Sequence, residues 1–227
     1  MLVTRPQPGA AETARRLTGM GRKPVVAPVI EIVQLAPRLP PPGELQAVLA
    51  TSGNAIAALA GHAELPLLAV GDATAAKARA RGFTVVHSAG RDAAALGELA
   101  ARMCDPGGLP LLFASQQNQG RPLVRALRAA GFTVLHRSAY AARAVPVLPE
   151  PARAALGART VSAVLFFSPA TARAFVALAA ALPAELFAQV DALAISPPAA
   201  AALAPLPWRS IRVAAAPNQD ELLGLLP

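Results

Sequence analysis

Two stretches of this chain resemble each other, and their order along the sequence leaves few possible folds. AVLATSGNAIAALA at Ala47–Ala60 is similar to AVLFFSPATARAFV at Ala163–Val176, and the units that follow the two copies also match. The first copy is followed by one more strand–helix–strand unit, Leu111–His136, and the second copy is not. A matching unit, LVTRPQPGAAETARRLTGMGRKPVV, stands at the front instead. The first strand is therefore predicted to join the C-terminal half of the chain.

This permuted duplication predicts two domains, because one copy of the repeat is interrupted by the other. The first domain is discontinuous and comprises residues 1–28 and 147–227, and the second, residues 35–137, is inserted into it. Residues 29–34 and 138–146 connect the two. Both connections alternate apolar and polar residues as strands do, and the prolines near them keep the chain extended. We expect them to form a two-stranded antiparallel linker.

Strand-like runs alternate with helical patterns along the whole chain, which is typical of α/β domains with parallel sheets. The runs are Leu2–Thr4, Val25–Ala27, Ala47–Thr51, Leu67–Val70, Thr84–His87, Pro110–Ala114, Thr133–His136, Val161–Phe167, Ala192–Ile195 and Ile211–Ala214. Ten strands in 227 residues suit two sheets of five. The predicted fold class is α/β, with two flavodoxin-like or Rossmann-like parallel-sheet domains. Such domains bind ligands at the carboxyl ends of their strands, so we expect the site in a cleft between them.

Small polar residues follow most of these predicted strands and open the next helix. Ser, Thr, Asp and Asn at such positions ordinarily cap helices. The alternative is that free N–H groups at the helix N-termini bind carboxylates or phosphates. Several such turns around one cleft would suit a ligand with many acidic groups. The candidate substrate-binding residues are Arg5, Thr51, Ser52, Asn54, Gly71, Thr74, Ser115, Gln116, Ser168 and Thr171.

The charge of the chain points to an anionic partner. The formal net charge is +8, with 19 Arg and only two Lys. A small polyanion fits this charge as well as nucleic acid does. The basic residues occur singly or in pairs, and 4% aromatic residues provide few platforms for stacking bases. We therefore expect no nucleic-acid partner, although a solvated Arg-rich surface would give the same composition.

Other classes of protein are disfavoured by what the sequence lacks. The longest apolar run, Ala174–Leu182, is far shorter than the roughly 20 residues that span a bilayer. Arg5, Pro6 and Pro8 interrupt the segment where a signal peptide would be apolar, so a cytoplasmic location is expected. The single cysteine, Cys104, and three scattered histidines show no metal-ligand spacing. No dinucleotide, phosphate-loop or nucleophile-elbow motif is present.

Tyr140 is the one candidate catalytic residue. It is the only tyrosine of the chain and lies on the second connection between the domains. Its phenol could point into the cleft and act as a weak acid. Packing against the linker is the alternative.

The order and spacing of several short motifs resemble the uroporphyrinogen-III synthase family over essentially the whole chain. The motifs are LVTRP at Leu2–Pro6, PVIEI at Pro28–Ile32, VLATSGNA at Val48–Ala55, AVGDATA at Ala69–Ala75, SAGRDAAAL at Ser88–Leu96, SAYAA at Ser138–Ala142 and LFFSPATARAF at Leu165–Phe175. The resemblance implies two α/β domains joined by a two-stranded linker. It also implies a lyase that cyclises hydroxymethylbilane, a linear tetrapyrrole with eight carboxylates, and inverts its last pyrrole ring.

The same resemblance implies how the residues would act. Members of the family use no metal or organic cofactor, and Tyr140 matches the tyrosine proposed to assist departure of the substrate hydroxyl. The chain departs from the family at two turns, where it has Ser196-Pro197-Pro198-Ala199 and Ser115-Gln116. The prolines remove two N–H groups from the first of these turns, so we expect little binding there.

We expect the enzyme to be a monomer with no membrane partner. Two other functions remain possible for this sequence. One is a non-catalytic two-domain protein that closes on a small polyanion, which predicts binding without turnover. The other is a nucleic-acid binder, which predicts basic residues gathered on one surface.

Overall fold

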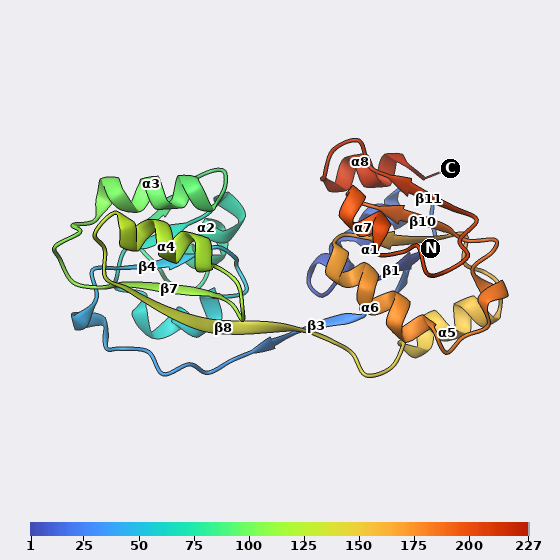
Figure 1. The fold of residues 1–227 in the computed structure, drawn as a ribbon, viewed down its shortest axis with the longest axis horizontal. Helices are drawn as coiled ribbons and strands as arrows, with labels where there is room; N and C mark the ends of the chain where they lie inside the picture. Colours follow the sequence, from blue (N-terminus) through green and yellow to red (C-terminus); the bar gives the residue numbers. More distant parts are fainter. Residues whose placement is uncertain (227) are drawn as a thin grey trace. The chain divides into compact units, whose positions relative to one another are not determined.

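A computed structural model describes residues 1–226 of the chain, which separate into two compact units. Unit 1 comprises Met1–Glu31 together with the chain from Arg143 onward, and unit 2 comprises Ile32–Ala142. The chain thus begins in unit 1, builds all of unit 2 and returns to complete unit 1 (Figure 1). Each unit has its own sheet and its own buried core.

Unit 1 contains a five-stranded sheet in the order β11-β10-β9-β1-β2, and all neighbouring strands are parallel. The first strand lies inside this sheet, because Leu2 pairs with Val25 on one side and with Val164 on the other. The pairing with Val164 confirms that the opening strand joins the C-terminal half. The strands are β1 (Leu2–Val3), β2 (Val25–Val26), β9 (Ala163–Phe166), β10 (Asp191–Ala194) and β11 (Ser210–Val213).

Helices cover both faces of this sheet because its central strands are apolar on both sides. Ala163 and Leu165 of β9 pack with α1 and α8, whereas Val164 and Phe166 pack with α5, α6 and α7. Phe166 also belongs to a group of aromatic rings with centroids 5.3–6.2 Å apart. The helices of the unit are α1 (Gly9–Gly19), α5 (Glu150–Gly157), α6 (Pro169–Ala179), η3 (Ala184–Leu186), α7 (Pro197–Ala201) and α8 (Gln219–Gly224).

Unit 2 contains a six-stranded sheet in the order β3-β8-β7-β4-β5-β6. Its strands from β8 to β6 are parallel to their neighbours. The strands are β3 (Ile30–Gln34), β4 (Ala47–Ala50), β5 (Leu67–Ala69), β6 (Val86–Ser88), β7 (Leu111–Gln116) and β8 (Val134–Ala144). The parallel α/β class predicted for both domains is confirmed.

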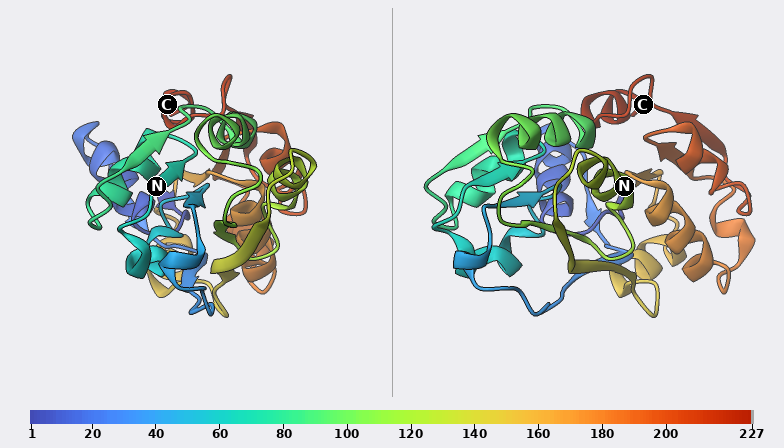
Figure 2. Two further views of the ribbon diagram at one scale, coloured as in Figure 1. Left: turned by 90° about the vertical axis from the view of Figure 1, so that its left-hand side faces the viewer. Right: turned by 60° about the vertical axis from the view of Figure 1, so that its left-hand side comes forward.

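The core of unit 2 has the same layered build. Val48 and Ala50 of β4 face α2 and η2, and Ala47 and Leu49 face α3 and α4. Figure 2 gives two further views of the sheets and of the helices. The helices of unit 2 are η1 (Pro42–Glu44), η2 (Ile56–His62), α2 (Asp72–Arg79), α3 (Ala93–Met103) and α4 (Arg121–Ala129).

The two connections between the units pair as antiparallel strands. The N–H of Leu35 donates to the carbonyl of Ala139 at 2.9 Å, and the N–H of Val145 donates to that of Val29 at 3.1 Å. From Val29 to Leu35 the residue numbers rise, while those of their partners fall from Val145 to Ala139, so the two strands are antiparallel.

Two details differ from the sequence prediction. The strands expected at Thr133–His136 and at 138–146 form one continuous strand, β8, because Arg137 and Ser138 keep pairing with β7 and no turn residue separates them. The sheet of unit 2 therefore gains β3 as a sixth strand. The segment after β4 forms the 3-10 helix η2, whereas its counterpart after β9 in the repeat forms the α-helix α6.

Candidate active site

Most of the turns named from the sequence lie at the carboxyl edge of the two sheets. In unit 1, Arg5 follows β1 and Ser168 follows β9, and these strands are neighbours. In unit 2, the neighbouring strands β7, β4 and β5 lead to Gln116, Thr51 and Gly71. Because parallel strands end at the same edge, the order of the strands brings these residues together within each unit.

Arg5 is held by contacts from several elements of unit 1. Its Nη1 donates to Thr13 Oγ1 at 3.2 Å and to Gln219 Oε1 at 2.8 Å. The Cζ atom lies 4.3 Å from the centre of the Phe167 ring. A Cβ atom at Gly9 would lie 2.5 Å from Arg5 Nε, so the glycine leaves room for this side chain. Burial lowers the pKa of Arg5, and Glu12 opposes this effect.

Gln219 is a residue of this site that sequence reasoning missed. Its Oε1 accepts from both Arg5 and Thr13. Its Nε2 is buried and has no hydrogen-bond partner within residues 1–226. A buried donor without a partner is costly, so this amide is an unsatisfied polar group beside Arg5. No local pattern could have paired Gln219 with a residue more than two hundred positions earlier.

Ser168 and Thr171 form a helix cap at the start of α6. Ser168 Oγ accepts from the N–H of Thr171 at 3.1 Å and lies 2.9 Å from Thr171 Oγ1. Thr171 is 2% exposed, whereas Ser168 is half-buried. The capping alternative therefore describes how these hydroxyls are used in unit 1. Ser196, by contrast, caps α7 without a side-chain hydrogen bond.

The turn after β4 borders a hollow of about 310 Å³ in unit 2. Ser52 Oγ accepts from the N–H of Asn54 at 3.2 Å, and Gln34 Nε2 donates to the carbonyl of Asn54 at the same distance. Thr51, Ser52 and Asn54 all remain half-buried. The complete lining is Gln34, Gly53, Asn54, Ile56, Ala57, Lys77, Ala80 and Arg81.

Two cations of that hollow were not among the candidate residues. Lys77 lies in α2, and Arg81 lies two residues beyond the end of this helix. Because they are four positions apart, both face the same side, toward the hollow. A Cβ atom at Gly53 would collide with the Lys77 side chain, so this glycine lets the lysine cross the turn. Their positive charges make the hollow suited to a carboxylate. A helical plot of the α2 segment would have revealed the pair, but not that it faces Asn54.

The start of α2 presents backbone donors at the same edge. Gly71 is the N-cap residue and has no side chain to satisfy the first amides of the helix. The N–H groups of Thr74 and Ala75 donate to the carbonyl of Gly71 at 3.0 Å. Thr74 itself is buried. Two of the first four amides of α2 are therefore already paired, and the exposed carboxylate of Asp72 lies in the same first turn.

Ser115 and His136 form a contact that the sequence did not suggest. Ser115 is 1% exposed, and its Oγ lies 2.7 Å from His136 Nε2. The hydroxyl also lies 3.1 Å from the carbonyl of Gln116 and 3.2 Å from that of Gln119. No carboxylate hydrogen-bonds His136 within the part of the chain that the structure describes, so the pair lacks the acid of a catalytic triad.

Tyr140 lies on β8 and is 5% exposed, within the apolar cluster that also contains Ala114 and Ala139. Its carbonyl accepts from the N–H of Gln117 at 2.8 Å, which ties β8 to the turn after β7. Most of the Tyr140 ring is therefore packed against apolar residues of unit 2. A catalytic role for its phenol stays a prediction.

Metal and membrane features are absent from residues 1–226. No group of three or more His, Cys, Asp or Glu side chains there could hold a metal ion. No helix in that part of the chain has the length and apolar character to cross a membrane. Cys104 is a free, half-buried thiol, and burial raises its pKa.

Two comparisons with known proteins find matches, and a third finds none. Residues 11–224 match the family model described as uroporphyrinogen-III synthase HemD. The crystal structure of a uroporphyrinogen-III synthetase from Helicobacter pylori 26695 is similar over 99% of this chain and 96% of that one, with 17% identity and a TM-score of 0.64. A mutant uroporphyrinogen III synthase from the extremely thermophilic bacterium Thermus thermophilus covers 98% of this chain and 96% of its own, with 17% identity and a TM-score of 0.46. A search of curated proteins by sequence finds no match. The Helicobacter likeness shows the fold.

Proposed function

Because the chain belongs to the uroporphyrinogen-III synthase family, we propose that it cyclises hydroxymethylbilane to uroporphyrinogen III with inversion of ring D and loss of water. The observation that carries this proposal is the family match over residues 11–224. The match also favours an enzyme over a non-catalytic binding protein, and it includes every candidate residue except Arg5.

The reaction asks little covalent chemistry of the protein. The substrate loses its terminal hydroxyl as water when a proton is supplied, and the electrons of its own pyrrole ring replace the broken C–O bond. The resulting electrophilic carbon is attacked by the substituted carbon of the last ring, which gives a spiro intermediate before the ring closes in the inverted sense. Left alone, the bilane closes to the symmetric isomer. Holding the flexible chain in one geometry is therefore the main catalytic task.

We assign substrate binding to the turns at the carboxyl edges. Arg5, Thr51, Ser52, Asn54, Gly71, Gln116 and Ser168 are at least half-buried but not enclosed, so they remain available to the carboxylates. Thr74, Ser115 and Thr171 are buried, and their contribution is to hold the main chain of those turns. Lys77 and Gln219 extend the set. The net charge of +8 favours capture of an eightfold carboxylate.

Tyr140 is assigned the proton donation that releases the hydroxyl, with no metal or organic cofactor. We further propose that the enzyme is a monomer. A cytoplasmic location belongs to the same proposal, since a chain with a single cysteine gains no disulfide from an oxidising compartment. Size-exclusion chromatography with light scattering tests the monomeric state.

The experiment that tests the function supplies hydroxymethylbilane in large excess over the purified protein and follows its consumption. An enzyme consumes many equivalents faster than spontaneous closure does, and heat-unfolded protein does not. A binding protein would instead retain one equivalent of hydroxymethylbilane, and the remainder would close at the spontaneous rate. That second outcome would replace the enzyme by the alternative reading.

A further inference from the structure

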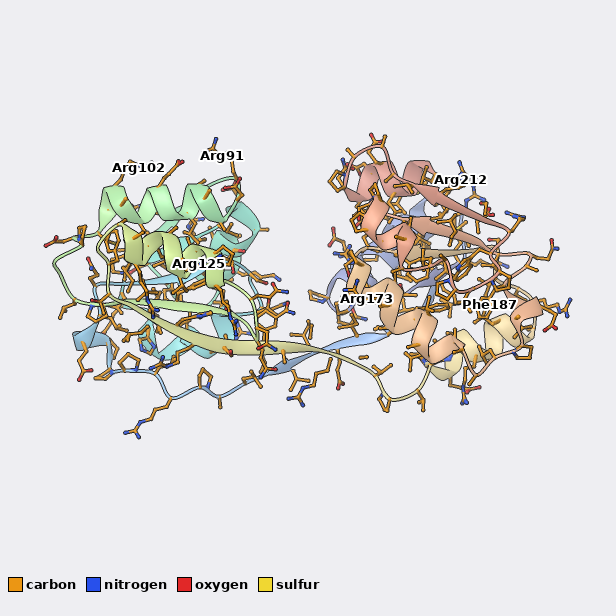
Figure 3. The ribbon with its side chains drawn as sticks, viewed as in Figure 1. Arg91, Arg102, Arg125, Arg173, Phe187 and Arg212 are labelled. Carbon is orange, nitrogen blue, oxygen red and sulfur yellow. The ribbon has the colours of Figure 1, made fainter. Side chains whose placement is uncertain are left out.

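Unit 2 has a second basic hollow, and none of the turns assigned to substrate binding lines it. It has a volume of about 300 Å³ and is lined by Arg121, Val124, Arg125, Arg128 and His136. Four of these five residues come from α4, and His136 comes from β8. Figure 3 shows Arg125 on α4 and, for comparison, Arg102 on α3.

The three arginines share one side of α4 because they lie four and three positions apart. All three are exposed. The four ion pairs within residues 1–226 involve other arginines, so no carboxylate of the described chain neutralises this group. Arg128 Nη2 donates to the carbonyl of Val134 at 3.1 Å, which fixes it toward β8. Like charges at these spacings repel one another, and a bound anion would relieve that repulsion.

His136 gives the hollow a rigid floor. Its ring stacks on Phe113 with 5.0 Å between centroids and an interplanar angle of 11°. Ser115 Oγ has backbone carbonyls within reach for its single proton, so it can accept from Nε2–H of His136. That arrangement leaves Nδ1 as the nitrogen that gains or loses a proton.

We propose that this hollow binds a multiply charged oxyanion through the guanidinium groups of Arg121, Arg125 and Arg128, with the imidazole of His136 as a further donor. Guanidinium groups bind phosphate and carboxylate oxygens in pairs, so both a phosphate and a polycarboxylate have the required chemistry. The proposal is separate from the cyclisation, because none of these four residues is among those assigned above to substrate binding or to proton donation.

The charges around His136 provide a direct readout. Burial lowers its pKa first, and the positive charges of Arg128, Arg121 and Arg137 lower it further. An anion among the arginines would oppose those charges, so binding must raise the pKa of His136. By linkage, the anion must also bind more tightly as His136 becomes protonated.

The test follows the imidazole NMR signals of the intact protein through a pH titration, with sodium phosphate or sodium citrate replacing sodium chloride at constant ionic strength. We expect a saturable rise in the pKa of His136 and little change at His87, which lies on β6. Phosphate and citrate compared at the same pH and ionic strength distinguish the two sources of oxyanion. A pKa that follows ionic strength alone in both salts would overturn the proposal.

Matched variants separate a local site from the general charge of the protein. Arg125→Gln should weaken binding of the better anion at least about fivefold, since one charge-assisted contact is lost. Arg102→Gln removes one exposed charge from α3 of the same unit and should leave the affinity within about twofold. Equal weakening by both variants would show nonspecific attraction and would also overturn the proposal.

Discussion

At the scale of single residues, Tyr140 combines a buried ring with a proposed chemical task. Because the ring packs among the apolar residues of unit 2, Tyr140→Phe keeps the packing and removes only the hydroxyl. We expect turnover of hydroxymethylbilane to fall at least about tenfold, as loss of a general acid does, while the unfolding midpoint stays close to that of the parent. Steady-state rates and urea unfolding measure the two effects. An unchanged rate would remove Tyr140 from the mechanism.

Asp191 gives unit 1 a stability that depends on pH. Its carboxylate is 5% exposed and accepts from Arg209 and from Ser210. The hydrogen bond from Arg209 is the main cause that lowers the pKa of Asp191, while burial opposes it. A lowered folded pKa means that this stability is complete above the unfolded pKa of about 3.8 and is lost as pH falls toward the folded value.

The variant Asp191→Asn should therefore unfold at a lower urea concentration than the parent at pH 7, and the difference should shrink below about pH 4. Asp220→Asn is the control, because Asp220 forms only an exposed pair with Arg16 and should change stability little. A difference between Asp191→Asn and the parent that is constant with pH would contradict the assigned cause.

At the scale of elements, two substitutions of Ser168 at the start of α6 can distinguish helix capping from substrate binding. Ser168→Ala removes the cap and should cost about 0.5–2 kcal/mol of stability. Ser168→Asp keeps an acceptor for the N–H of Thr171 but adds a negative charge where a substrate carboxylate is proposed to lie. We expect it to retain stability and to raise KM. A KM equal to that of the parent would leave Ser168 as a cap alone.

The elements themselves were largely predictable, whereas the contacts between them were not. Apolar runs between turn residues marked the strands, because a parallel strand buried on both faces must be apolar throughout. The continuity of β8 was not predicted, because its first residues were assigned to the sheet of the second domain and its last residues to the linker. The contacts Ser115–His136 and Arg5–Gln219 join residues far apart in the chain, and no local period reports them.

At the scale of the whole molecule, the order of the repeat predicted that the opening strand joins the C-terminal half, and β1 pairs with β9 of that half. β1 lies between β9 and β2, so removing residues 1–28 would take away both β1 and β2 and leave β9 paired with β10 alone. Unit 2 would keep every strand from β4 to β8. We expect the truncated chain to lose hydrogen-exchange protection in β9 and β10 and to keep it in β4 and β7. Retained protection in β9 would contradict this account of unit 1.

The fate of the substrate is the most direct test of the proposed function. Hydroxymethylbilane is incubated with increasing concentrations of the protein, and the uroporphyrinogen isomers that form are identified after oxidation to porphyrins. Our account predicts that isomer III replaces the symmetric product of spontaneous closure as protein is added, until it is essentially the only product. A product that remains the symmetric isomer at every protein concentration would contradict it.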